Sequence, residues 1–360
     1  MHEYSWNKTM NHANQTEERK REHIQISLEE DVSAHHNYWD DVTLIHNALP
    51  EINADEITTT TKLFGKKLGA PLIIAGMTGG FKEGKKINEN LAAAAEKYQL
   101  GMGVGSQRAA LENPQLEDTY SIIKDYNIPL KIANIGASQI VLWDKKKILE
   151  YANTIVNMID ADVLAVCLNF LQEIVQPEGQ AHAKGCLDTI TMLSKEFNKP
   201  VIIKESGAGI SAHIATMLMK TKIAGIDVGG AGGTSFAAVE YYRAQLLNDE
   251  KNMRLGKTYW DWGIPTPTSI LQVEKATNRK LPIIATGGIR NGLDAAKALA
   301  LGAHAAGIAH AMLKPATQDK TKTIFELDVI IKELQTAMFL VGADTIDKLT
   351  HTEVGYEPKN

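Results

Sequence analysis

A polar cluster follows an apolar run near the middle of the chain, in the stretch LAVCLNFLQEIVQPEG (164–179). Three of its side chains can do chemistry: the amides of Asn169 and Gln172 and the carboxylate of Glu173. A lone carboxylate suits a Mg²⁺ ligand, because Mg²⁺ takes one or two carboxylates and fills its shell with phosphate oxygens and water. The alternative for Glu173 is a carboxylate that interacts with the N-terminal dipole of a helix, and position alone does not separate the two.

Two glycine-rich segments late in the chain could bind a phosphate. They read GGAGGTS (229–235) and TGGIRNG (286–292), and they carry Thr234 and Arg290. Glycine lets backbone N–H groups approach an anion, and a following helix adds partial positive charge. One such segment alone would favour a simple tight turn into a helix. Two in successive units favour a phosphate site.

Flavin mononucleotide (FMN) would fit such a phosphate site, with its ring over polar groups at the ends of other predicted strands. These groups are Met77, Thr78, Gly79, Ser106, Asn134 and Lys204. A lysine near the N1–C2=O edge of a flavin stabilises the anionic reduced ring. The alternative for Lys204 is an ion pair with a neighbouring carboxylate such as Asp227, because lysine is seldom buried unpaired.

A second anion site is suggested by basic residues elsewhere. Arg108 follows Ser106 and Gln107 in GSQRAAL, and ERKREHI places Arg19, Lys20 and His23 within two turns of a predicted helix. On its own such a basic run is ordinarily a solvated helix face. A substrate diphosphate, however, needs several cations and donors beyond those that hold a cofactor phosphate.

Alternating short apolar runs and amphipathic stretches must position these side chains. The runs predict eight strands, within 70–77, 100–106, 129–135, 162–169, 200–205, 224–229, 281–287 and 303–309. Near-continuous apolar strands are typical of parallel strands buried on both faces. The pattern predicts an α/β fold, a single (β/α)8 TIM barrel with its site on the loops after the strands. Residues 1–60 or so read as an N-terminal extension that contributes to the substrate site, and 241–267 as an insertion after the sixth strand.

Composition limits the class of protein. The chain has 360 residues, 44% hydrophobic and 22% charged, with a net charge of -5 and no dominant basic block, so we expect a soluble protein that binds no nucleic acid. No apolar run approaches the roughly 20 residues of a membrane span, so we expect no membrane partner. The N-terminus lacks the apolar core of an export signal, and the two cysteines lack metal-ligand spacing, so we expect a reducing cytoplasm.

Motifs along nearly the whole chain resemble the type 2 isopentenyl-diphosphate delta-isomerases. They include RKREHI, GMTGG, GSQR, LNFLQEIVQPEG, GGAGGTS and ATGGIRNG in this order, a combination far more specific than any one of them. The resemblance implies an enzyme that binds FMN and Mg²⁺ and interconverts isopentenyl and dimethylallyl diphosphate. It also implies a homo-oligomer, a tetramer or octamer. The flavin must be reduced although the reaction is redox-neutral, and NADPH is the implied reductant.

The resemblance also assigns roles to individual positions. It implies Glu173 as the metal ligand and Gln172 as the catalytic residue at the reacting carbons, where it would assist proton exchange at the flavin N5. The implied substrate-binding residues are Arg19, Lys20, His23, Ser106, Gln107, Arg108, Asn169 and Gln172. The implied FMN-binding residues are Met77, Thr78, Gly79, Ser106, Asn134, Lys204, Thr234, Gly287, Gly288, Arg290, Ala309 and His310.

Two positions depart from the pattern of that family. Cys167 stands where a histidine usually helps to bind the diphosphate, and Gln180 stands where an acidic residue often follows PEG. We interpret Cys167 as a tolerated substitution, because Asn169, Gln172 and Glu173 are all present.

Three other functions fit the sequence less well. An FMN-dependent 2-hydroxy-acid oxidase would need a histidine base and an arginine after strand six, but Ala231, Gly232, Gly233 and Thr234 stand there. A phosphate-binding barrel without catalysis has no need of an amide at reacting carbons. A metallohydrolase would need histidines clustered with carboxylates, and the spacing of the histidines does not supply such a cluster.

Overall fold

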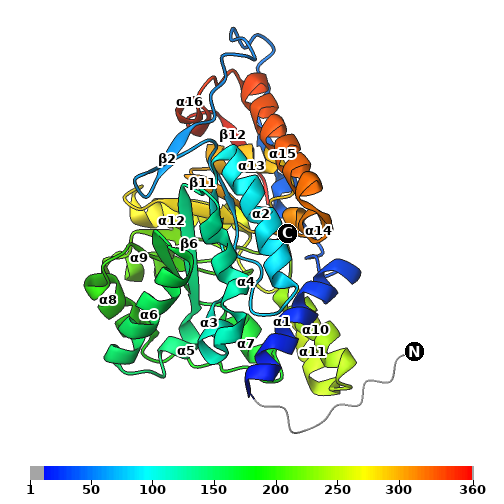
Figure 1. The fold of residues 1–360 in the computed structure, drawn as a ribbon. Helices are drawn as coiled ribbons and strands as arrows, with labels where there is room; N and C mark the ends of the chain where they lie inside the picture. The colour runs from blue at the N-terminus through cyan, green and yellow to red at the C-terminus, as the bar shows by residue number, and fades with distance from the viewer. Residues whose placement is uncertain (1–11, 359–360) are drawn as a thin grey trace.

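A closed barrel of eight parallel strands forms the centre of the molecule in the computed structural model, which describes residues 12–358 (Figure 1). All eight predicted strands are present, seven of them inside their predicted ranges and β6 one residue beyond its predicted end at 135, so the predicted TIM barrel is confirmed. Around the barrel they are β4 (Leu72–Ile74), β5 (Gly101–Gly103), β6 (Leu130–Gly136), β7 (Val163–Cys167), β8 (Val201–Lys204), β9 (Gly225–Asp227), β10 (Ile283–Thr286) and β11 (Ala305–Ile308).

The barrel closes where β11 pairs with β4, with Gly307 opposite Ile73. The longest strand, β6, pairs with β7 from Ile132–Val163 to Gly136–Cys167. Side chains on the outer face of the strands pack against the surrounding helices, and a smaller apolar cluster fills the barrel interior. Burial on both faces explains why the strands read as near-continuous apolar runs.

Helices follow most strands and cover the barrel. Their N-termini are often capped: Asp144 accepts a hydrogen bond from the Lys147 amide, and Ser235 from the Ala238 amide. The α-helices are α1 (His12–Glu29), α2 (Gly84–Tyr98), α3 (Arg108–Glu112), α4 (Asp118–Ser121), α5 (Ala137–Ile140), α6 (Lys145–Ile159), α7 (Phe170–Val175), α8 (Cys186–Glu196), α9 (Ala212–Leu218), α10 (Phe236–Leu246), α11 (Glu250–Thr258), α12 (Thr266–Thr277), α13 (Gly292–Ala300), α14 (His310–Gln318), α15 (Lys320–Val341) and α16 (Ile346–Thr350). Short 3₁₀ helices are η1 (Tyr38–Asp41), η2 (Pro114–Leu116) and η3 (Ile122–Asp125).

A hairpin closes the end of the barrel at which the strands begin. Its strands β2 (Thr61–Leu63) and β3 (Lys66–Leu68) are antiparallel, and Leu63 and Leu68 pack with side chains of the barrel interior. Phe64 at its turn lies against Gly225, the first residue of β9. Since this end is filled by apolar side chains, a ligand site must lie at the opposite end, where the strands finish.

The segment before the barrel wraps around it. Helix α1 packs against α3, α10 and α14, and its place beside α10 is visible in Figure 1. Strand β1 (Val42–Leu44) pairs with β12 (Val354–Tyr356) from the other end of the chain. Between α1 and β1, Ser33 forms an antiparallel bridge with Thr234. The N-terminal segment therefore contacts the loop that follows β9.

Within residues 12–358, no helix is both long and apolar enough to cross a lipid bilayer. The stretch 1–11, which forms part of the N-terminus examined for an export signal, lies outside the described residues.

Candidate active site

The loops after β9 and β10 lie directly against one another. A Cβ atom on Gly233 would be 2.5 Å from the backbone nitrogen of Gly288, and one on Gly287 would overlap the Gly230 carbonyl. Gly287 and Gly288 have φ angles of 122° and 73°, which other residues rarely adopt. The two segments therefore form one glycine-rich cradle whose backbone a phosphate group could approach closely.

The N-terminal segment holds this cradle from outside. Asn37 Nδ2 donates to the Gly288 carbonyl at 2.9 Å, and Trp39 Nε1 donates to the Gly287 carbonyl at 2.9 Å. The Ala34 amide donates to the Gly233 carbonyl at 2.8 Å. The carbonyls are thereby held outward. The sequence offered no signal for Asn37 and Trp39, because both act across more than 240 residues of chain.

The predicted phosphate ligand Arg290 is already engaged by two carboxylates. Its guanidinium contacts Asp294 at 2.8 Å and Asp40 at 2.5 Å, and hydrogen bonds to these two groups raise the pKa of Arg290 well above its usual range. The side chain is 44% exposed. Ala309 precedes α14, and His310 Nε2 lies 3.0 Å from the Ser27 carbonyl of α1. Because the Arg290 guanidinium is already paired with two carboxylates, the backbone of the glycine-rich turns is better placed than the Arg290 side chain to bind a phosphate.

Replacing Gly233 with alanine should abolish tight FMN binding, because the added Cβ cannot fit beside the Gly288 nitrogen unless the cradle opens. We expect the Kd of FMN to rise by about 100-fold or more, the order of loss that a small misplacement in a preorganised site can cause. Quenching of flavin fluorescence measures this. Gly355→Ala is the matched control, since its Cβ would meet no atom closer than 3.9 Å. Equal affinities in the two variants would contradict the assignment.

Buried charged groups end the strands on the other side of the barrel mouth. Lys204 at the end of β8 is paired in register with Cys167 of β7 and Asp227 of β9. Burial opposes the charge on Lys204, but Cys167, Asp227 and Glu205 outweigh it and raise the pKa of Lys204. Burial raises the pKa of both Asp227 and Cys167. Lys204 is therefore a fixed cation, and both predicted roles, flavin contact and ion pair, are compatible with this geometry.

Asn134 and the loop after β4 complete the rim. Asn134 Nδ2 donates to the Val104 carbonyl at 3.2 Å, while its buried Oδ1 has no partner among the described residues. Gly79, with φ of 124°, packs against the ring of Tyr120, and Met77 is half-buried beside it in sequence. Thr78 is 2% exposed, and its carbonyl accepts from the Gly105 amide. An orphaned acceptor at the rim, a fixed lysine and a glycine cradle together fit a flavin nucleotide.

A cluster of cations lies at the junction of α1 and α3. Lys20 Nζ donates to the Ser106 carbonyl at 2.9 Å, and Arg108 Nε contacts Glu112 at 2.6 Å. Burial, together with the positive charges of Arg19 and Arg108, lowers the pKa of Lys20 to about 7. Burial and the same crowding lower the pKa of Arg19. Glu112 offsets part of this positive charge, yet the lowered pKa values of Lys20 and Arg19 show that the cations still crowd one another, and an anionic ligand would relieve that crowding.

His23 and Gln107 are positioned differently from the other predicted substrate residues. His23 Nε2 lies 2.8 Å from Glu240 of α10, and burial lowers the pKa of His23. Gln107 is fully buried: its Nε2 donates to the Ile155 carbonyl at 2.8 Å, and its Oε1 accepts from the Asn134 amide at 3.1 Å. The Gln107 side chain therefore braces β6 and α6 from within the protein and offers no exposed atom to a ligand.

Asn169, Gln172 and Glu173 are brought together at the start of α7. Asn169 Nδ2 donates to Gln172 Oε1 at 3.2 Å and to Glu173 Oε1 at 3.3 Å. Gln139 Nε2 also donates to Glu173 Oε1, and the Gln180 amide donates to Glu173 Oε2 at 2.9 Å. These donors fix the carboxylate, which is 7% exposed, and Oε2 retains capacity for a further ligand.

Of the three side chains at the start of α7, Glu173 is the one carboxylate, and it accepts hydrogen bonds from Gln139, Asn169 and the Gln180 backbone. No group of three or more His, Cys, Asp or Glu able to hold a metal occurs among residues 12–358. The donor set therefore fits Mg²⁺ in one manner only, as a single glutamate that shares the ion with ligand phosphate oxygens and water.

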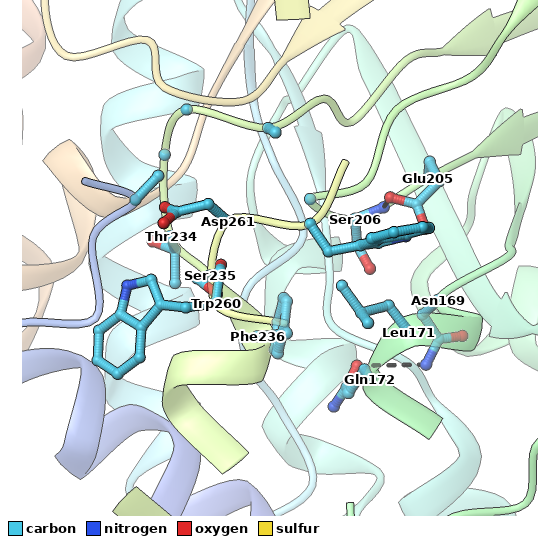
Figure 2. A pocket seen from close by; sticks show the side chains of 16 residues that line it. Asn169, Leu171, Gln172, Glu205, Ser206, Thr234, Ser235, Phe236, Trp260 and Asp261 are labelled. Atoms are coloured by element: carbon cyan, nitrogen blue, oxygen red, sulfur yellow. Dashed lines mark hydrogen bonds between the residues drawn. The ribbon is translucent and has the colours of Figure 1, made fainter. Parts of the chain in front are cut away.

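A pocket connects the amides of α7 to the glycine cradle. Figure 2 shows Asn169, Leu171 and Gln172 on one side, Thr234, Ser235 and Trp260 on the other, and Phe236 between them. The predicted insertion contributes the wall formed by Trp260, Asp261 and Trp262. The Ala231 amide donates to the Ile264 carbonyl, and no imidazole or guanidinium stands in the loop from Ala231 to Thr234. The pocket thus lacks the base expected of a hydroxy-acid oxidase.

The barrel and its glycine cradle define the class of FMN-dependent barrel enzymes. The family model for FMN-dependent dehydrogenase matches residues 166–355, more than half of the chain. A solved structure of mandelate oxidase with (S)-2-phenylpropionate superposes with a TM-score of 0.64, covering 97% of this chain and 99% of that chain, at 15% identity. At that identity the likeness shows the fold alone.

Curated relatives specify the family further. An isopentenyl-diphosphate delta-isomerase from Thermoplasma acidophilum is 48% identical over 339 residues, covering 93% of this chain and 95% of that protein. Proteins of the same name from Methanosarcina mazei and Archaeoglobus fulgidus are 45% and 43% identical, covering 95% and 94% of this chain and 92% and 95% of their own lengths. The chain belongs to the isopentenyl-diphosphate delta-isomerases.

Proposed function

We propose that this protein interconverts isopentenyl and dimethylallyl diphosphate with reduced FMN and Mg²⁺. The observation that carries the proposal is the position of Gln172 and Glu173, neighbours on α7 that lie between the cation cluster and the pocket leading to the glycine cradle. Glu173 is close enough to Arg19 for its charge to affect the pKa of Arg19. A ligand with a diphosphate at one end and an apolar chain at the other matches that order of groups.

The cations of α1 and α3 would bind the diphosphate. Arg19, Lys20 and Arg108 supply the positive charge, and Glu173 would hold Mg²⁺ against the phosphate oxygens. Anchoring the diphosphate places the carbon chain toward Leu171, Gln172 and Phe236. Binding energy from the remote diphosphate then orients the reacting carbons.

The reaction moves a double bond by one carbon, adding a proton at one end of the allylic unit and removing one from the other, with no net electron transfer. Reduced FMN would supply an electron-rich ring and an N5 that exchanges a proton, and NADPH is the proposed reductant. Gln172 would orient the migrating proton through its amide, which Asn169 holds at 3.2 Å. Burial of the pocket between α7 and the insertion would exclude water from a carbocation-like transition state.

We also propose a homo-oligomer in the cytoplasm, a tetramer or octamer, on the basis of the family resemblance. The same basis supports one domain for 1–360, with the extension before about residue 60 completing the substrate site. Lys20 in contact with the Ser106 carbonyl supports that last point.

The test of the proposed function is anaerobic incubation of the purified protein with FMN, Mg²⁺, NADPH or dithionite, and isopentenyl diphosphate. We expect dimethylallyl diphosphate to form only while the flavin is reduced. Absence of conversion with flavin fully bound and reduced would refute the proposal and favour a binding barrel. Consumption of a 2-hydroxy acid in parallel assays would favour the oxidase instead.

Diphosphate affinity should fall as pH rises above 7. The free protein holds Lys20 at a pKa of about 7, and a bound diphosphate would raise that pKa, so binding above pH 7 takes up a proton. The Kd should therefore increase by up to about tenfold per pH unit above pH 7, and Lys20 should add no dependence well below it. Calorimetry in buffers of different ionisation enthalpy measures the proton uptake. In Lys20→Arg the uptake should disappear; if it persists, another group is responsible.

A further inference from the structure

Arg243 lies at the centre of a buried ion cluster outside the pocket. Its side chain is 5% exposed and contacts three carboxylates: Glu22 at 2.8 Å, Glu178 at 3.0 Å and Glu240 at 2.7 Å. Burial opposes the charge on Arg243, but the carboxylates outweigh it and raise the pKa of Arg243 well above its usual range. Arg243 therefore stays charged and forms the centre of the ion cluster.

The three carboxylates come from three parts of the chain. Glu22 belongs to α1, Glu178 to the turn that follows α7, and Glu240 to α10 itself. The contact between Glu22 and Arg243 spans 221 residues of sequence, and the contact between Glu178 and Arg243 spans 65. A guanidinium presents donors in several directions from one planar group, which a lysine ammonium cannot match.

Two of the carboxylates that contact Arg243 also contact residues of the proposed substrate site. Glu178 also lies 3.8 Å from Arg19, and Glu240 lies 2.8 Å from His23. On its opposite side, α1 is held to the barrel by Lys20, which donates to the Ser106 carbonyl, and by Thr16, which donates to Glu112 at 2.8 Å. Arg243 itself is not among the residues that line the pocket.

We propose that Arg243 is a positioning residue that sets the diphosphate-binding cations of α1 against the turn after α7. Without it, three carboxylates would face one another with no central cation, and repulsion would displace α1 from α10. Arg19 and Lys20 would move with the helix while the glycine cradle stayed in place. This inference rests on the proposed function for the identity of the substrate, but the position of α1 can be measured without it.

Arg243→Gln in the FMN-loaded protein tests the proposal. We expect the Kd of inorganic diphosphate with Mg²⁺, and the KM of isopentenyl diphosphate, to rise by about tenfold or more, because displacement of a binding group by even an ångström is costly. We expect kcat to change by less than about threefold, since Gln172 and the cradle are untouched. Hydrogen exchange should accelerate within 12–29 and remain unchanged in the 286–292 turn.

Matched variants separate positioning from general loss of structure. Arg21→Gln also removes a cation from α1, but Arg21 is 43% exposed and contacts Glu18, so all these quantities should stay at wild-type values. Arg243→Lys should restore part of the affinity. Glu22→Gln removes only the contact between α1 and Arg243, and it should also raise the Kd of diphosphate. This second variant keeps the test decisive if Arg243→Gln does not fold.

The proposal is overturned if Arg243→Gln and Glu22→Gln bind diphosphate like the wild type. It is equally overturned if FMN affinity, kcat and diphosphate affinity all fall together in Arg243→Lys and Glu22→Gln, because that pattern indicates a merely structural role. Failure of the wild-type protein to convert isopentenyl diphosphate would reject the proposed function alone, since exchange in 12–29 and diphosphate binding would still be measured.

Discussion

Gln172→Ala is expected to lower kcat by about a thousandfold, within the 10²- to 10⁴-fold range of a lost proton-transfer group, while the Kd of FMN changes by less than about twofold. The reason is geometric: Gln172 lies in the pocket wall beside Leu171 and is held by Asn169, and it belongs to α7 and not to either glycine-rich turn. Steady-state conversion of isopentenyl diphosphate by the reduced protein gives kcat, and flavin fluorescence gives the Kd.

Two further variants make this result specific. Gln180→Ala removes an amide side chain near the same turn, but only the backbone of Gln180 contacts Glu173, so turnover should stay close to wild type. Gln172→Asn keeps the amide on a side chain that is one methylene shorter. Its kcat should lie between the values for Gln172→Ala and Gln180→Ala. If Gln172→Ala lost FMN and turnover to the same extent, its role at the reacting carbons would be refuted.

Glu173→Gln is expected to raise the Mg²⁺ concentration for half-maximal activity by about 100-fold or more, because removal even of a group behind a metal ligand costs about 10- to 100-fold in affinity. The described residues hold no cluster of three or more potential metal ligands, so the ion would depend heavily on this one carboxylate. The amide nitrogen of the new side chain would also face donors from Gln139, Asn169 or the Gln180 backbone. Activity measured across a Mg²⁺ titration gives the shift.

Glu173→Asp is the companion variant, since it keeps the charge and shortens the side chain by one methylene. It should retain part of the Mg²⁺ response. An unchanged Mg²⁺ requirement in Glu173→Gln would remove Glu173 from the metal site and leave it as a carboxylate that stabilises the start of α7. FMN affinity, measured in both variants, shows whether the fold is intact.

The barrel was predictable because its determinants are local. Strands buried on both faces must be apolar along their whole length, so runs such as 162–169 mark β7 without any knowledge of its neighbours. The contact between the two glycine-rich turns was also foreseeable, since successive strands of a barrel end side by side. The pairing of β9 with β10 explains why Gly233 meets Gly288.

The parts that escaped prediction are held by contacts between distant segments. Nothing near Asn37 or Trp39 indicates that they bind the carbonyls of residues 251 and 248 positions later. Gln107 stands beside Ser106 and Arg108 in a motif, yet its side chain turns into the protein because Ile155 and Asn134 satisfy it there. A motif fixes neighbours along the chain, whereas the direction of each side chain is set by packing.

The way in which α1 is docked has a consequence for the order of assembly. Its polar contacts to α10 join residues 217 and 221 positions apart, and its contacts to the 106–112 region join residues 86 and 96 apart. Pairings this distant form late, because the intervening chain must first lose its freedom. Barrel strands joined across one helix pay a smaller entropic cost and can pair earlier. The segment proposed to bind the diphosphate is therefore synthesised before the barrel, but its contacts to α10 can form only after α10 itself has been made.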